Sequence, residues 1–158
     1  MPNSQSLPLT EIHILEECCA IEEKCAHIYR HFGKIFSDEP DICLLWNGVA
    51  SEEDHHADFF RLAVRKLTSG IMDVNPCFKN INKLMSTLDS IHREVETNHP
   101  SLADAFGLAL TIEKSLAECH IDLVVKFSDS DISELFLKME KYDQGHLKLL
   151  QNAIDSLR

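Results

Sequence analysis

Residues 53–60 read Glu-Asp-His-His-Ala-Asp-Phe-Phe and residues 143–146 read Asp-Gln-Gly-His, so each half of the chain contains an acid followed three residues later by histidine. Each half also has one acid further upstream, Glu22 in the first and Glu113 in the second. Two helix pairs built in this way bring four carboxylates and two imidazoles to one place. This is the ligand set of a di-iron or di-manganese centre in a four-helix bundle.

The acid-x-x-His pattern is weak by itself, because this chain has 26 acidic residues and nine histidines. Residues three apart lie on the same helical face. The matches can therefore be distinguished by whether that face is the apolar or the solvent-exposed one. Two matches fall where the apolar face is expected, Glu53/His56 and Asp143/His146. The other three are predicted to be solvated surface pairs: Glu52/His55, Asp89/His92 and Glu96/His99.

Apolar residues recur in alternating steps of three and four over residues 15–36, 42–67, 102–127 and 132–157, which predicts four bundle helices. A shorter amphipathic segment at 77–99 carries no acid on its apolar face. We read it as a crossover helix between the two halves. The predicted fold is therefore all-α, a four-helix bundle with one long crossover that contains an additional helix.

Composition limits the class of protein. The chain has 158 residues, 44% of them apolar, with five glycines and five prolines, which favours a single helix-rich domain spanning residues 1–158. A formal net charge of −11 disfavours binding to nucleic acid or to an anionic membrane. No apolar run is long enough to span a bilayer, and residues 1–10 lack the regions of a signal peptide, so we expect a cytoplasmic protein.

The six cysteines include no Cys-x-x-Cys pair, which argues against zinc-ribbon, rubredoxin and thioredoxin motifs and favours reduced thiols. Cys18 and Cys25 share the helical face of Glu22 and are expected to be small core residues. Gly145 lies inside the last predicted helix, where glycine costs up to about 1 kcal/mol relative to alanine. Close helix packing and room for a ligand are both possible reasons for it.

The inward acids need compensation, because burying an unpaired charge costs several kcal/mol. Two divalent cations would supply it, with carboxylates capping and bridging them and one imidazole on each. Mixed oxygen and nitrogen ligation with open positions favours iron or manganese over a structural zinc site, although the residues do not choose between iron, manganese and zinc. The predicted ligands are Glu22, Glu53, His56, Glu113, Asp143 and His146.

The chain resembles the di-iron domain of rubrerythrins, in the ferritin-like superfamily, from about residue 9 to residue 157. That family has a ligand glutamate with tyrosine seven residues later, as in Glu22 and Tyr29, then Glu-x-x-His followed by alanine and aromatic residues, as in 53–60. A third helix supplies glutamate and a fourth repeats Glu-x-x-His; here Glu113 and 143–146 match, with aspartate in place of the last glutamate.

Three departures separate the chain from rubrerythrins proper. Asp143 is one methylene shorter than glutamate, and Leu116 stands where rubrerythrins carry an additional glutamate. Residues 1–158 contain no rubredoxin-like sequence with two Cys-x-x-Cys motifs, so we expect peroxidase turnover to need a separate electron donor protein. The resemblance also implies a homodimer.

The expected function is that of a non-haem di-iron or di-manganese oxidoreductase that reduces peroxide or dioxygen, or oxidises ferrous iron. One alternative is a metal-binding or storage module without fast turnover, and another is a structural helical module with a decayed site.

Tyr29 and His120 occupy equivalent positions in the two halves, seven residues after the first acids. Each is expected to hydrogen-bond a ligand carboxylate, to be a core residue with a satisfied polar tip, or, for His120 alone, to ligate directly. Because Tyr29 is opposed to His120 and Glu53 to Asp143, the two metal positions should not be equivalent.

Overall fold

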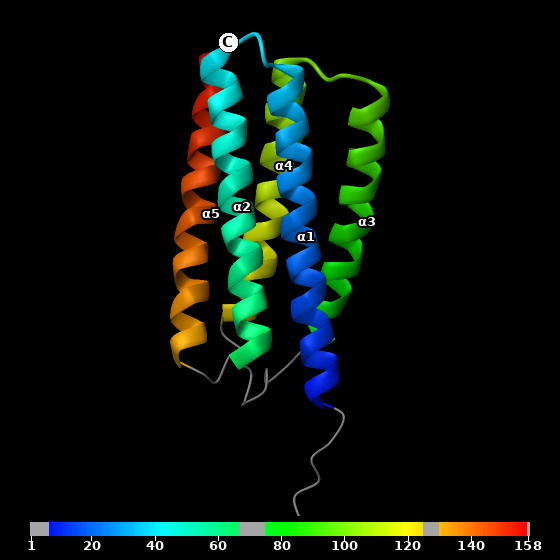
Figure 1. Cartoon of the computed structure of the whole chain (residues 1–158), viewed down its shortest axis with the longest axis vertical. Helices are drawn as coiled ribbons and strands as arrows, with labels where there is room; N and C mark the ends of the chain where they lie inside the picture. The colour runs from blue at the N-terminus through cyan, green and yellow to red at the C-terminus, as the bar shows by residue number, and fades with distance from the viewer. Residues whose placement is uncertain (1–6, 67–74, 125–129, 158) are drawn as a thin grey trace, which may run out of the picture.

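The computed structural model describes residues 7–66, 75–124 and 130–157, and these form five α-helices with no strand among them (Figure 1). The prediction of an all-α chain is confirmed. The helices are α1 (Leu7–Ile35), α2 (Pro40–Lys66), α3 (Asn75–Thr97), α4 (Leu102–Val124) and α5 (Ser130–Ser156). The ends of the predicted helical patterns at residue 67 and at 125–127 lie outside the described residues.

Successive helices alternate in direction, and they lie side by side along the long axis (Figure 1). The closest neighbours are α1 with α2 and α4 with α5, and the two pairs meet through α1 with α4 and through α2 with α5. Helix α3 covers one side, beside α1 and α4, and occupies the segment in which the crossover helix was expected. Because α3 runs in the same direction as α1, their facing residues keep a constant register.

Helix starts follow local chemistry. Pro40 is the first residue of α2, where its missing N–H has no partner to lose and its fixed φ suits a helix. The Ser101 hydroxyl oxygen accepts a 3.1 Å hydrogen bond from the backbone N–H of Asp104, which caps α4. These signals place the turns at the ends of the bundle and leave the helix centres free to build a core.

The core contains a stack of aromatic rings from three helices. Trp46 lies between Tyr29 and Phe106, with ring centroids 5.9 Å and 5.0 Å away, and its ring is 4.9 Å from Phe32. All four side chains are at most 1% exposed. Cys18 and Cys25 are buried in the same core, as predicted, and neither forms a disulfide within the described residues. The side chain of Cys77 lies outside the described residues.

None of the helices in the described part of the chain is apolar over a stretch long enough to traverse a bilayer.

Candidate metal centre

Seven polar side chains are buried in the middle of this core, and together they form the candidate metal centre. They come from α1, α2, α4 and α5 and are at most 4% exposed. Six of them are the predicted ligands, and the seventh is the histidine expected to support them. The set is Glu22, Glu53, His56, Glu113, His120, Asp143 and His146.

Two groups within this set have the composition of a metal site. In the first, one ligand atom from each of Glu22, Glu53 and His56 lies within 4.8 Å of the others. In the second, Glu53, Glu113 and His146 meet the same limit. Glu53 belongs to both groups, which places it where a carboxylate would bridge two ions.

The His56 ring faces the first group. Its Nδ1 lies 3.4 Å from an Oε atom of Glu53 and 3.8 Å from one of Glu22, and it makes no hydrogen bond with either. In the second group, Nδ1 of His146 is 3.2 Å from oxygens of both Glu53 and Glu113. Both imidazoles therefore turn the same nitrogen toward the carboxylates, as the ligands of a metal ion would.

The other nitrogen of His146 contacts Glu52, which corrects the prediction that Glu52 belongs to a solvated surface pair. Its Nε2 is paired with Oε2 of Glu52, whose side chain is 43% exposed. A carboxylate on the far nitrogen fixes the ring orientation and tautomer of a metal-binding histidine. His55, the other member of the predicted pair, is exposed, as expected.

The two halves of the centre support each other reciprocally. The Tyr29 hydroxyl on α1 donates a 2.6 Å hydrogen bond to Glu113 on α4, and Nε2 of His120 on α4 lies 2.5 Å from Glu22 on α1. Each residue therefore contacts the first acid of the opposite half, one of the roles expected for the pair. His120 also contacts Asp143, with Nδ1 to Oδ2 at 2.6 Å. Asp143 consequently lies in the cluster but in neither three-residue group.

Several buried polar atoms of the centre make no hydrogen bond to the protein. A buried polar atom without a partner is uncommon and needs an explanation. Four such oxygens and both nitrogens of one imidazole gather here, which fits cations held between them. The atoms are Oε2 of Glu22, Oε1 and Oε2 of Glu53, Nδ1 and Nε2 of His56, and Oδ1 of Asp143.

Without metal, protonated histidines compensate the negative charge of the buried carboxylates. Burial lowers the pKa of His56, but Glu22 and Glu53 outweigh it and raise that pKa to about 10. Burial likewise opposes protonation of His146, but Glu113 and Glu53 raise its pKa to about 12. Both nitrogens of His120 face carboxylates, which raise its pKa well above the ordinary value despite burial.

The acids divide into two kinds. Burial raises the pKa of Glu22, but His120, together with the neighbouring Glu53 and His56, outweighs it and lowers that pKa to about 2. Burial and the neighbouring Glu22 raise the pKa of Glu53, and burial and Glu53 raise the pKa of Glu113. The negative charge of Glu53, the residue common to both groups, is therefore poorly compensated in the metal-free protein.

These pKa values predict the stability of the metal-free protein against pH. The raised pKa of His56 stabilises the fold fully below 6.5, its ordinary value, and this contribution is lost as pH rises through about 10. We expect the free energy of unfolding to fall between pH 6.5 and 10 by at least about 1.4 kcal/mol, the equivalent of one pKa unit. Urea denaturation with chelator present measures it. His55→Gln should leave this slope unchanged and His56→Gln should reduce it; a flat profile for the unaltered chain contradicts the prediction.

Between α2 and α5 the centre approaches the surface. A cavity of about 380 Å³ is lined by residues that include Glu52, His56 and Tyr142, and a neighbouring one of about 560 Å³ by residues that include His146 and Gly145. A Cβ atom at Gly145 would meet nothing within 4 Å. Close helix packing is therefore not the reason for this glycine, and it leaves open space beside His146.

The described residues define a class: an all-α helical bundle with a buried carboxylate–imidazole cluster that could hold metal. No family model, curated protein or solved structure matches the chain. Its function is therefore inferred from the geometry of the cluster.

Proposed function

We propose that the cluster is a di-metal carboxylate centre of rubrerythrin type, and that the fold is a ferritin-like bundle of α1, α2, α4 and α5 with α3 as the crossover helix. The observation that carries this proposal is the pair of three-residue groups that share Glu53. The first group and the second would each hold one ion. Iron is the expected metal, with manganese or zinc as alternatives, because the donors are carboxylate oxygens and imidazole nitrogens.

Charge balance supports two ions rather than one. Four carboxylates are buried in the cluster. Two divalent cations would balance them with all three buried imidazoles neutral, whereas one ion would leave two negative charges for the histidines to compensate. Asp143, with its Oδ1 unpartnered, is available as a further ligand from the side of His120.

We propose an oxidoreductase that reduces peroxide or dioxygen with electrons from a separate donor protein, or that oxidises ferrous iron with dioxygen or peroxide as the electron acceptor. Bound ions with open coordination positions would supply the redox chemistry. The chain itself supplies orientation and protons: Tyr29 holds Glu113, Glu52 holds His146, and His120 carries a proton between Glu22 and Asp143. The cavity lined by Glu52, His56 and Tyr142 would admit a small oxidant from the α2–α5 side.

A second candidate, a metal-binding or storage module without fast turnover, is favoured by two observations. Nδ1 of His120 lies 2.6 Å from Oδ2 of Asp143. Because of this contact, the short carboxylate does not take the position of a second bridging ligand. Leu116 is buried where the resembling family has a further acid. A centre with one bridging carboxylate would bind ions but respond slowly to an oxidant.

Metal analysis by mass spectrometry tests both candidates, using protein expressed with iron and manganese available. About two ions per chain are expected in the buried centre, together with an electronic spectrum that changes in air or after peroxide. Saturable peroxide consumption with an artificial electron donor supports the oxidoreductase, and two ions without turnover support the storage module. A metal content near zero would overturn both.

The pairing of Glu52 with His146 makes its own prediction. Glu52→Ala is expected to lower metal affinity by about 10–100-fold, because the ring loses the carboxylate that fixes its orientation. Competition with a coloured chelator measures the change. Asp54→Ala is the matched control: Asp54 is also on α2 but pairs with Arg30 on α1. Equal affinities for the two variants would show that Glu52 does not position the histidine.

A further inference from the structure

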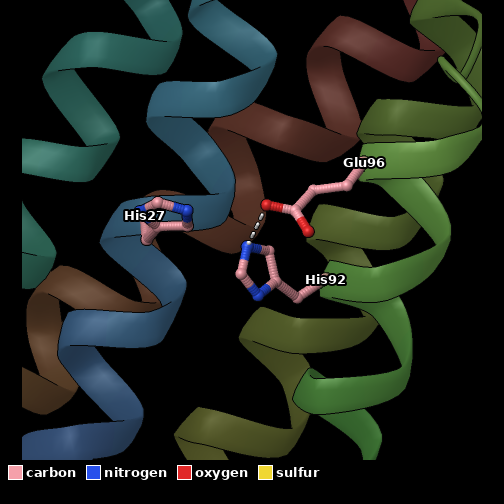
Figure 2. Close-up of side chains that lie close together, drawn as sticks. All are labelled: His27, His92 and Glu96. Atoms are coloured by element: carbon pink, nitrogen blue, oxygen red, sulfur yellow. Dashed lines mark ion pairs between the residues drawn. The ribbon is translucent and has the colours of Figure 1, made fainter.

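A second group of metal-ligating side chains lies outside the buried cluster, between α1 and α3. His27 comes from α1, and His92 and Glu96 come from α3, and Figure 2 shows the two imidazoles and the carboxylate gathered in the space between the helices. One ligand atom from each residue lies within 4.8 Å of the other two. Sequence reasoning placed His92 and Glu96 in separate surface pairs and did not connect either with His27.

Of the three side chains, His92 is partly buried, whereas His27 and Glu96 are exposed. The His27 and His92 rings meet edge to face, with centroids 4.7 Å apart. Nε2 of His92 lies 3.1 Å from Oε1 of Glu96, yet it is buried and makes no hydrogen bond. An imidazole nitrogen that faces a carboxylate without hydrogen-bonding geometry is free to bind an ion between them.

The flanking contacts between α1 and α3 are already satisfied by protein atoms. Toward the start of both helices, Lys24 forms an ion pair with Asp89. Toward their ends, Nε2 of His31 lies 3.1 Å from the carbonyl oxygen of Val95. Along α1, His27 lies between these two contacts.

We propose that His27, His92 and Glu96 form a mononuclear site for a divalent first-row transition metal ion such as Zn²⁺, which ties the crossover helix α3 to α1. Two imidazole nitrogens and one carboxylate oxygen suit zinc and its neighbours, whereas Ca²⁺ and Mg²⁺ prefer oxygen ligands alone. A water molecule would complete the tetrahedron.

The geometry requires only a small closure. Ligand atoms around tetrahedral zinc, with bonds of about 2.0–2.2 Å, lie roughly 3.3 Å apart. Nε2 of His92 and Oε1 of Glu96 are already 3.1 Å apart. His27 and Glu96 are exposed, so rotation of their side chains can bring the remaining atoms together.

Zinc titration calorimetry and mass spectrometry on the full chain, first stripped with chelator, test the proposal. His27→Ala and His92→Ala are each expected to bind one zinc ion fewer than the unaltered chain. His13→Ala is the matched control, an exposed histidine on the same helix about 21 Å away at 1.5 Å per residue, and should lose none. Unchanged zinc stoichiometry in both α1–α3 variants overturns the proposal.

The test is kept separate from the buried cluster by repeating it in a Glu53→Ala background. The zinc ion lost with His27→Ala should still be lost there, whatever the buried cluster binds. If Glu53→Ala itself removes no ion, that result counts against the buried centre alone.

Hydrogen exchange tests whether the ion ties the helices together. In the Glu53→Ala protein, zinc is expected to slow amide exchange across residues 81–95 of α3. Adding His27→Ala should abolish this slowing, because α3 alone would then retain two of the three ligands. Slowing that persists without His27, or no slowing at all, contradicts a link between α1 and α3.

Discussion

Glu53→Ala is expected to reduce the metal content of the buried centre from about two ions per chain to none. Glu53 is the residue common to both three-residue groups, so its loss removes a ligand from each position at once. No other carboxylate in the described part of the chain belongs to both groups. Losing any other ligand should leave one position nearly intact.

Metal analysis of the purified variant measures this loss, with circular dichroism to show that the helices remain. Glu118→Ala is the control, an exposed acid on α4. Glu53→Gln keeps the volume of the side chain and removes its charge, so it separates loss of ligation from a packing defect. A full complement of metal in both Glu53 variants would remove the basis for a shared bridging carboxylate.

His120→Leu is expected to lower the free energy of unfolding of the metal-free protein by about 3–5 kcal/mol, the usual cost of removing one partner from a buried ion pair. The His120 ring lies between Glu22 and Asp143, with contacts of 2.5 Å and 2.6 Å. Leucine fills most of the space but leaves two buried carboxylates without their common cation. The loss should therefore exceed that caused by most core substitutions.

Addition of metal provides the distinguishing measurement. Divalent ions in the centre would replace the missing positive charge, so iron or manganese should recover much of the stability of His120→Leu. His55→Leu, an exposed histidine on α2, should change stability by no more than about 0.5 kcal/mol. A change of similar size in both variants would mean that the ring of His120 is not a stabilising cation.

The helices could be predicted well from the sequence because apolar residues that recur every three or four positions mark the buried face of a helix. The steps of three and four that marked the apolar faces also placed Glu22, Glu53, Glu113 and Asp143 inward, and all four are fully buried. The opposed positions of Tyr29 and His120 likewise correspond to reciprocal contacts across the core. In each case, the side chain direction follows from the position on a helix alone.

Contacts between residues of different helices depend on how the helices pack, and the apolar periodicity of each helix carries no information about that packing. Glu52 is one position off the inward face, and only the approach of α5 brings His146 within reach of its long side chain. His27 and His92 meet because α3 packs against α1 in parallel, a pairing that no local pattern specifies. Asp143 had two possible partners, a metal position and His120, and the three-dimensional arrangement pairs it with the histidine.

The aromatic stack in the core has a practical consequence, because Trp46 is the only tryptophan in the chain. Its ring stacks on Tyr29, whose hydroxyl holds Glu113. The sole strong intrinsic fluorophore is therefore two contacts away from the Glu113 carboxylate of the buried cluster and is shielded from solvent. Occupation of the centre should alter its emission, so the protein carries a built-in optical reporter with which loading and removal of ions can be followed in real time without a label.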